Sequence, residues 1–159
     1  MALLVGRHLN KIDKKGRVSV PKPFRSAFES PDFSGIYVFK SFKFPALEIC
    51  ARDFMKRLAE SIDELALFSD DQDDLAPLIL GNAHELAFDP EGRVVLPPDT
   101  VEFAQLTDQA LFVGGGTRVQ IWNPTAYESH HAQARERARN RGTTLQLRPR
   151  PPVPGENGE

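Results

Sequence analysis

The chain contains Ile12-Asp13-Lys14-Lys15-Gly16-Arg17-Val18-Ser19-Val20-Pro21, and 76 residues later it contains Phe88-Asp89-Pro90-Glu91-Gly92-Arg93-Val94-Val95-Leu96-Pro97. The two stretches share Asp, Gly, Arg, Val and Pro at matching positions, and His8 falls on His84 at the same offset. A repeat at a fixed offset indicates a duplicated structural unit. Because there are only two copies, we expect two half-folds packed around one core rather than a solenoid.

Each copy predicts the same order of elements: a strand, the Gly-Arg turn, a second strand, a short helix and a hairpin. Apolar segments mark the hairpin strands at residues 35–39, 47–50, 110–113 and 119–122. Gly16 and Gly92 can adopt the positive φ that a tight turn requires. Pro21 and Pro97 suit the end of a strand and the start of a helix. One unit of about 50 residues would bury too little surface alone. We therefore expect a mainly β fold with accessory helices (α+β), in which the two units interleave.

The segment between the copies predicts two helices. Apolar residues recur at helical spacing over about Arg52–Phe68, at Phe54, Leu58, Ile62 and Leu65. A shorter helix is expected to begin with Asp74 as its N-cap, with Pro77 tolerated in its first turn. The acidic stretch of residues 70–74 lacks the glycine and terminal glutamate of a calcium loop, so we interpret it as a solvated linker with a helix cap.

The C-terminal part predicts one surface helix and a tail. Asn123-Pro124 is a cap followed by proline, and the helix should run to about Asn140, before Gly142. Its few apolar residues indicate a surface position. The segment from Arg148 to Glu159 is rich in Pro, Arg and Gly without periodicity, which predicts disorder.

Composition favours a cytoplasmic protein. The chain has 159 residues, which is room for one compact domain or two small ones sharing a core. The single Cys50 cannot form an intrachain disulfide, and we expect it to fill the core. Met1 to Val5 is too short for the apolar region of a signal peptide. No apolar run approaches the roughly 20 residues that a membrane helix needs, so no membrane partner is expected.

Charge is segregated along the chain although the net charge is only −2. From Arg7 to Arg25 seven basic residues face one acidic residue, Asp13, and the matching stretch from Ala83 to Val101 is acidic. The seven are Arg7, Lys11, Lys14, Lys15, Arg17, Lys22 and Arg25. Six more arginines lie between Arg135 and Arg150. This asymmetry predicts one basic face for a polyanion, with ordinary solvated surface as the alternative.

The residues of the first turn suit contact with double-stranded DNA. An arginine such as Arg17 can donate to guanine O6 and N7, whereas lysines act as point charges for phosphates. A two-stranded ribbon fits the major groove. We expect Asp13 and Asp89 to hold the turns by accepting backbone N–H groups, with Gly16 and Gly92 providing the turn conformation. Because Arg17 and Arg93 are both retained, a shared structural pairing of arginine with aspartate remains open.

Other candidate chemistry is weak. Gly114-Gly115-Gly116 lacks the Lys-Ser/Thr of a phosphate loop and predicts a flexible hairpin loop. His130-His131, like His8 and His84, lacks the ligand spacing of a metal site, so we assign no metal and no cofactor. No catalytic set is visible, and we assign no catalytic residue. An enzyme that uses the His and Asp pairs remains a minor alternative, which binding retained in EDTA without turnover would exclude.

The doubled motif identifies a resemblance. Asp13-x-Lys15-Gly16-Arg17 followed by Val-x-Val-Pro, with the degenerate copy Asp89-x-x-Gly92-Arg93, resembles the MraZ family over about residues 5–127. The resemblance implies two tandem SpoVT-AbrB-type swapped-hairpin modules, at residues 5–54 and 82–127, forming one pseudo-symmetric β-barrel core. Linker helices would occupy residues 55–81, and residues 128–159 would form the C-terminal helix and tail.

The resemblance also implies a function. Such a protein would be a bacterial transcriptional regulator, expected to repress the division and cell-wall gene cluster. It would bind direct repeats in promoter DNA on the nucleoid as a ring-shaped homo-oligomer larger than a dimer. Its DNA contact would map onto Lys15 and Arg17, and Lys11, Lys14, Arg7 and Lys22 would add positive charge. Glu91 replaces the lysine in the second copy, after Pro90, so we expect that turn not to contact DNA.

A second function in the same superfamily remains open. An antitoxin-like protein would wrap its Arg-rich and Pro-rich tail around a protein partner and fold on binding. Such antitoxins usually carry one module per chain, whereas this chain has two copies.

Overall fold

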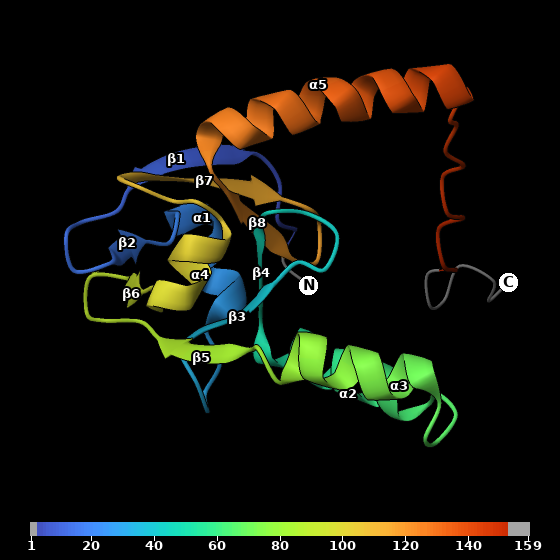
Figure 1. The fold of residues 1–159 in the computed structure, drawn as a ribbon, viewed down its shortest axis with the longest axis horizontal. Coiled ribbons are helices and arrows are strands. Elements are labelled where there is room, and N and C mark those ends of the chain that lie inside the picture. The colour runs from blue at the N-terminus through green and yellow to red at the C-terminus, as the bar shows by residue number, and fades with distance from the viewer. Residues whose placement is uncertain (1–2, 153–159) are drawn as a thin grey trace, which may run out of the picture. The chain divides into compact units, whose positions relative to one another are not determined.

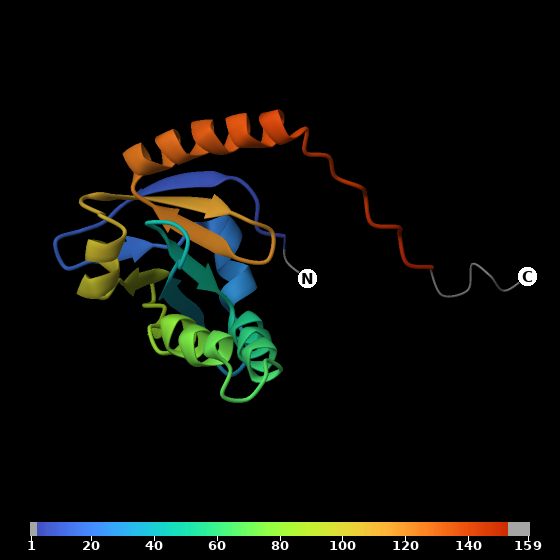
Figure 2. The same cartoon turned by 45° about the vertical axis from the view of Figure 1, so that its right-hand side comes forward.

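The computed structural model describes residues 3–152 (Figures 1 and 2). The chain divides into a unit that ends at Glu128 and a unit that begins at Ser129. The first repeat forms β1 (Arg7–Lys11), β2 (Arg17–Ser19), α1 (Lys22–Arg25), the 3₁₀ turn η1 (Ser26–Phe28), β3 (Gly35–Lys40) and β4 (Leu47–Cys50). The second forms β5 (His84–Ala87), β6 (Arg93–Val95), α4 (Pro98–Phe103), β7 (Gln109–Gly114) and β8 (Val119–Trp122). Each repeat thus has the predicted order of elements, and the α+β class is confirmed.

The two repeats exchange their first strands. Six strands form one antiparallel sheet in the order β1-β7-β8-β4-β3-β5. β1 of the first repeat pairs with β7 of the second, and β5 of the second pairs with β3 of the first. β4 and β8 join the two halves at the centre. Interleaving therefore follows directly from strand pairing.

The expected β-barrel is wrong, because the sheet is open. β1 and β5 are its two edges, and in the described chain they do not pair with each other. After each edge strand the chain turns away at a Gly-Arg turn into β2 or β6. These two short strands pair with each other in a separate two-stranded sheet, so they do not close the larger one.

The small sheet lies on the pseudo-two-fold axis of the repeat. Val18 is the register partner of Val94, its own equivalent in the other copy. Beyond the strands, the Leu96 amide donates to the Gly16 carbonyl at 2.9 Å, and the Val20 amide donates to the Gly92 carbonyl at 3.1 Å. The matched bonds tie each Gly-Arg turn to the strand end of the other repeat. Because β2 and β6 run antiparallel, the two turns lie at opposite ends of the small sheet.

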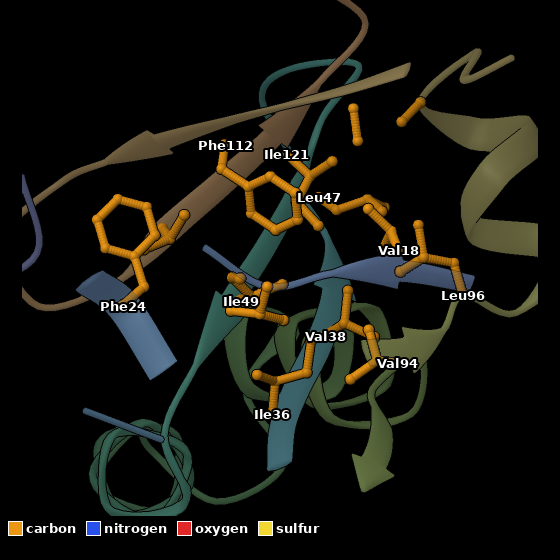
Figure 3. Close-up of a cluster of buried hydrophobic side chains, with 14 of the residues drawn as sticks. Val18, Phe24, Ile36, Val38, Leu47, Ile49, Val94, Leu96, Phe112 and Ile121 are labelled. Atoms are coloured by element: carbon orange, nitrogen blue, oxygen red, sulfur yellow. The ribbon is translucent and has the colours of Figure 1, made fainter. Parts of the chain in front are cut away.

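Both repeats contribute to one hydrophobic core (Figure 3). Val18 and Val94 are each 1% exposed, and they pack with side chains from the hairpins of both repeats. Those side chains include Ile36, Val38, Leu47, Ile49, Phe112 and Ile121. Burying a side chain of this size contributes about 1.5–3 kcal/mol relative to exposure. Since the cluster draws on both copies, neither copy has a complete core of its own.

The helices between the repeats differ from expectation in their bounds. α2 spans Arg52–Asp63 and ends before the predicted Phe68. The Gln72 side-chain amide donates to the Ile62 and Leu65 carbonyls at 3.2 and 3.3 Å, which satisfies backbone groups at that helix end. Phe68 has a φ of 65°, outside the helical region. α2 therefore stops where the chain turns back.

The predicted cap of the next helix is also wrong. α3 spans Asp70–Leu75, and its N-cap is Ser69, whose hydroxyl accepts from the Gln72 amide at 3.2 Å. The acidic stretch is thus helical rather than a linker, and its carboxylates favour a helix N-terminus. Pro77 lies in the first turn of η2, a π-helical segment over Ala76–Leu80. In Figures 1 and 2, α2 and α3 lie side by side.

The C-terminal helix matches its prediction closely. α5 spans Pro124–Arg141, and the Asn123 side chain accepts from the Thr125 and Ala126 amides at 2.9 and 3.1 Å. Gly142 follows with a φ of 63°. Residues 148–152 have no regular secondary structure and are exposed. The rest of the segment predicted to be disordered, residues 153–159, lies outside the described residues. Every helix within residues 3–152 is too short or too polar to span a lipid bilayer.

Candidate nucleic-acid interface

Asp13 organises the first Gly-Arg turn. Its Oδ1 accepts from the Lys15 and Arg17 amides, both at 2.9 Å, and its Oδ2 accepts from Arg17 Nε at 2.6 Å. The backbone closes the turn, since the Gly16 amide donates to the Asp13 carbonyl at 3.0 Å and the Asp13 amide to the Arg17 carbonyl at 3.0 Å. Gly16 has a φ of 82°, which favours glycine. One carboxylate thus fixes the backbone and the arginine together.

The second turn has the same construction. Asp89 Oδ1 accepts from the Glu91 and Arg93 amides at 2.9 Å each, and its Oδ2 accepts from Arg93 Nε at 2.7 Å. Gly92 has a φ of 78°. The structural pairing of arginine with aspartate, left open by the sequence, is therefore present in both copies. In both turns the aspartate holds the backbone and the arginine side chain, which accounts for the presence of the two residues in both copies.

These hydrogen bonds set the acidity of the two aspartates. The Arg17 backbone N–H, followed by its side chain, lowers the pKa of Asp13 below its ordinary value. Arg93 lowers the pKa of Asp89 in the same way. The bond to Asp89 in turn raises the pKa of Arg93. Both turns therefore hold charged pairs at neutral pH.

The side chains that the turns present differ in charge. Lys14 and Lys15 are exposed, and neither side chain forms an ion pair or hydrogen bond with any of residues 3–152. At the position of Lys15 the second turn has Glu91, whose Oε2 lies 3.7 Å from Arg93 Nη1. Arg17 uses Nε for Asp13, and its side chain is 34% exposed. The first turn offers uncompensated positive charge, whereas the second is largely neutralised.

The other predicted basic residues are only partly gathered at the turn. Lys11 ends β1, opposite Gln109, and is exposed at the base of the first turn. Lys22 is exposed at the start of α1. Arg7 is the first residue of β1. At roughly 3.4 Å per residue, it lies about 14 Å from the end of the strand that leads into the first turn. Its guanidinium lies 3.7 Å from Glu128 and 5.5 Å from the centre of the Tyr127 ring. Arg7 is therefore engaged away from the turn.

Arg25 has a position that the sequence reasoning missed. It belongs to the first repeat, but its guanidinium lies on Gly92 of the second turn, where an added Cβ would collide with it. Its Nε donates to the Val20 carbonyl at 3.1 Å. The positive charge of Arg25 thus lies against the backbone of the second turn, at Gly92. No sequence signal marks this contact, because it joins residues far apart in the chain.

Comparison with known proteins gives the family. A transcriptional regulator MraZ from Parvibaculum lavamentivorans is 44% identical over 135 residues, covering 83% of this chain and 83% of the relative. This chain belongs to the MraZ family. The MraZ regulator of Pelagibacter ubique is 39% identical over 86% of this chain and 88% of its own length. That of Gluconacetobacter diazotrophicus is 37% identical over 87% and 90%. The family model described as "MraZ protein, putative antitoxin-like" matches residues 79–148.

The remaining candidate groups of this MraZ family member have structural roles. Gly116 exchanges backbone hydrogen bonds with Leu4 at 3.1 and 2.8 Å, so the glycine run is a hairpin loop with a backbone partner. His8 packs edge-on against Phe24, with ring centres 5.1 Å apart, and His84 Nε2 lies 3.3 Å from Asp99. Among the described residues, no three His, Cys, Asp or Glu side chains gather as a metal site would require. Burial raises the pKa of Cys50 to about 12, so its thiol stays protonated.

Proposed function

We propose that this protein is a DNA-binding transcriptional regulator that recognises promoter direct repeats through its first Gly-Arg turn. The observation that carries this proposal is the contrast between two turns of one construction. Both have the Asp–Arg pair, and only the first adds unpaired lysines. The names of the relatives, transcriptional regulators, support the regulatory role.

The first turn is suited to base and phosphate contacts. Asp13 holds Arg17 through Nε, which leaves the two terminal nitrogens of the guanidinium to donate to guanine O6 and N7. A side chain held before binding loses less conformational entropy on binding. Lys14 and Lys15 flank the turn as phosphate contacts, and Lys11 and Lys22 add charge nearby. Glu91 would repel phosphate at the second turn.

The finer family assignments belong to the same proposal. We assign the interleaved repeats to SpoVT-AbrB-type swapped-hairpin modules, which the exchange of β1 and β5 supports. The regulated genes are the division and cell-wall cluster, and the mode is repression. The protein acts in the cytoplasm, associated with the nucleoid.

Assembly into a closed ring supplies the affinity that one turn lacks. A good bidentate base contact is worth about 1–3 kcal/mol of discrimination, which is small against many non-specific sites. Joining identical turns can raise avidity by about 10²–10⁴. Exposed apolar side chains offer surfaces for association, at 50% exposure for Leu9 on edge strand β1 and 81% for Phe68. Repeats spaced by about one helical turn would place every contact on one side of the duplex.

Selection of genomic fragments by the purified protein tests this function. The expected result is enrichment of promoter fragments with direct repeats spaced by about 10 bp, upstream of cell-wall or division genes. The Lys15→Ala/Arg17→Ala variant, shown to assemble normally, should lose that enrichment. No enrichment by the unchanged protein, or equal enrichment by the variant, would contradict the proposal.

The family description favours one second candidate. It contains the words antitoxin-like, and its match includes α5 and part of the tail. In that function the tail would bind a protein partner. Co-purification of a stoichiometric partner that removal of residues 142–159 abolishes, without any fragment enrichment, would favour this candidate over DNA binding.

A further inference from the structure

The second half of α5 carries a concentrated positive charge. Arg135, Arg137, Arg139 and Arg141 are all exposed, and the one acidic residue among them is Glu136. No ion pair joins these arginines to any other described residue; Arg141 Nε has a 3.4 Å contact with the Thr143 hydroxyl. The chain as a whole has a net charge of −2, so the charge of this segment is opposite in sign to that of the whole chain.

The spacing places the arginines on two flanks of the helix. At about 100° per residue, Arg135 and Arg139 lie on one side, and Arg137 and Arg141 lie almost opposite. Between the flanks, on one face, are the small residues Ala134 and Ala138. Arg141 lies about 20° from Ala134 and Arg135 about 60° from Ala138, with His131 between Ala138 and Arg135. Glu136 lies on the far side of the helix, roughly 160° from both alanines. The helix thus presents a face of Ala134, Ala138 and His131 that is bordered by guanidinium groups on both sides.

This arrangement matches the groove of a nucleic-acid duplex. The major groove of B-DNA is about 12 Å wide and admits an α-helix, whose diameter with side chains is about 10–12 Å. Phosphates line both walls, so arginines on two opposite flanks can reach both at once. A protein groove would instead require an apolar anchor stripe. From Ser129 onward α5 has only alanines as apolar residues.

We propose that residues 129–141 form a second DNA-binding element, in which Arg135, Arg137, Arg139 and Arg141 contact phosphates on both walls of a groove without reading sequence. This proposal rests on the proposed function of the first turn and adds a separate contact to it. The turn selects the repeats, and the arginine helix raises affinity for all duplexes. Because the contacts are to phosphates, their contribution falls with salt.

The test replaces all four arginines with glutamine in the full-length protein, and a matched variant replaces them with lysine. Gln, Lys and Arg have similar helix propensities, so α5 should persist in both variants, which circular dichroism checks. Binding is measured against salt on a repeat-bearing duplex obtained by genomic selection and on a scrambled duplex of equal length. Light scattering establishes that both variants have the mass of the unchanged protein.

The expected result has three parts. The glutamine variant loses affinity for both duplexes by the same factor. Its slope of log K against log salt flattens by up to about 3.6 per bound helix. The lysine variant retains most of the affinity and most of the slope. Unchanged slopes on both duplexes would overturn the proposal while leaving the first turn intact as reader. A loss confined to the repeat-bearing duplex would also overturn it.

Limited trypsin digestion of the unchanged protein supplies a second measurement that needs no variant. Scrambled duplex should protect the peptide bonds after Arg135 to Arg141 from cleavage at low salt. Protection by an acidic protein or polyglutamate, with none by duplex, would mean that the helix binds a protein partner instead, and the proposal would be wrong.

Discussion

At the scale of single residues, Asp13 and Asp89 make the stability of the fold depend on pH. The folded state lowers the pKa of both carboxyl groups below the ordinary value of 3.8. Their stabilising contribution is therefore complete above that value and is lost as pH falls below it, through the folded pKa. We expect the midpoint of chemical denaturation to fall as the pH drops below about 4, and to fall less in Asp13→Asn/Asp89→Asn. Equal pH dependence of the two proteins would contradict this role. Glu85, whose pKa is also lowered in the folded state, accounts for part of the pH dependence that remains in the double variant.

The arginines of the two turns form a matched pair. Arg17 and Arg93 make the same bonds to aspartate, at 2.6 and 2.7 Å. Arg17→Ala and Arg93→Ala should therefore lower the melting temperature, and Arg93→Ala should disturb folding or assembly more than it affects DNA contact. Only Arg17→Ala should weaken DNA binding of correctly assembled protein, as fluorescence anisotropy would measure. A correctly assembled Arg93→Ala protein that has lost affinity for DNA would contradict this prediction and would show that both turns contact DNA.

Much of the turn could be predicted from the sequence, and one part could not. The repeat marked Asp13, Gly16 and Arg17 because both copies use them in the same local geometry. Local geometry depends on neighbouring residues, which a motif records. Arg25 belongs to the first repeat, but its side chain contacts the turn of the second repeat. A contact between residues far apart in the chain leaves no local sequence pattern.

At the scale of secondary-structure elements, the pairing of β3 with β5 depends on Gly35. A Cβ at that position would collide with the Leu86 carbonyl oxygen and with Phe33. Gly35→Ala should therefore destabilise the protein by about 3 kcal/mol, because backbone cannot move aside as a flexible side chain can. Gly116→Ala is the comparison variant: its φ of 91° strains an alanine, but no neighbour lies within 4 Å, so it measures backbone strain without a collision. Chemical denaturation that finds the Gly35 variant no less stable than the comparison variant would contradict this assignment.

A buried carboxylate joins β4 to β8. The Glu48 side chain is 7% exposed, and it accepts from Arg118 Nε and Gln120 Nε2, both at 2.9 Å. Arg118→Met should cost about 2–3 kcal/mol in unfolding free energy, because it removes one partner from a buried charge. The same change in a Glu48→Leu background should cost much less. Equal costs in both backgrounds would show that the pair is not coupled.

The limits of the helices show why periodicity alone was insufficient. Leu65 continues the apolar spacing of α2, but the Gln72 amide occupies the carbonyls at the helix end. That contact comes from the following helix. The apolar faces were predicted because they follow local spacing, whereas the helix ends depend on side chains from elsewhere.

At the scale of the whole molecule, the repeat predicted interleaved halves but not the open sheet. Closure depends on which strands pair at the edges, and β2 and β6 pair with each other instead. We expect a closed homo-oligomer larger than a dimer. Light scattering at micromolar concentration that shows a monomer, together with undiminished affinity for a single isolated repeat, would contradict this assembly.

The most direct test of the central claim compares Lys15→Ala with Glu91→Ala, the equivalent position of the other turn. Affinity for the selected repeat-bearing duplex is measured against salt for both variants and the unchanged protein, with assembly verified. Lys15→Ala should weaken binding and flatten the slope of log K against log salt by about one per engaged turn. Glu91→Ala should leave the slope unchanged. Equal effects of the two substitutions, or an unchanged slope for Lys15→Ala, would contradict the assignment of DNA recognition to the first turn.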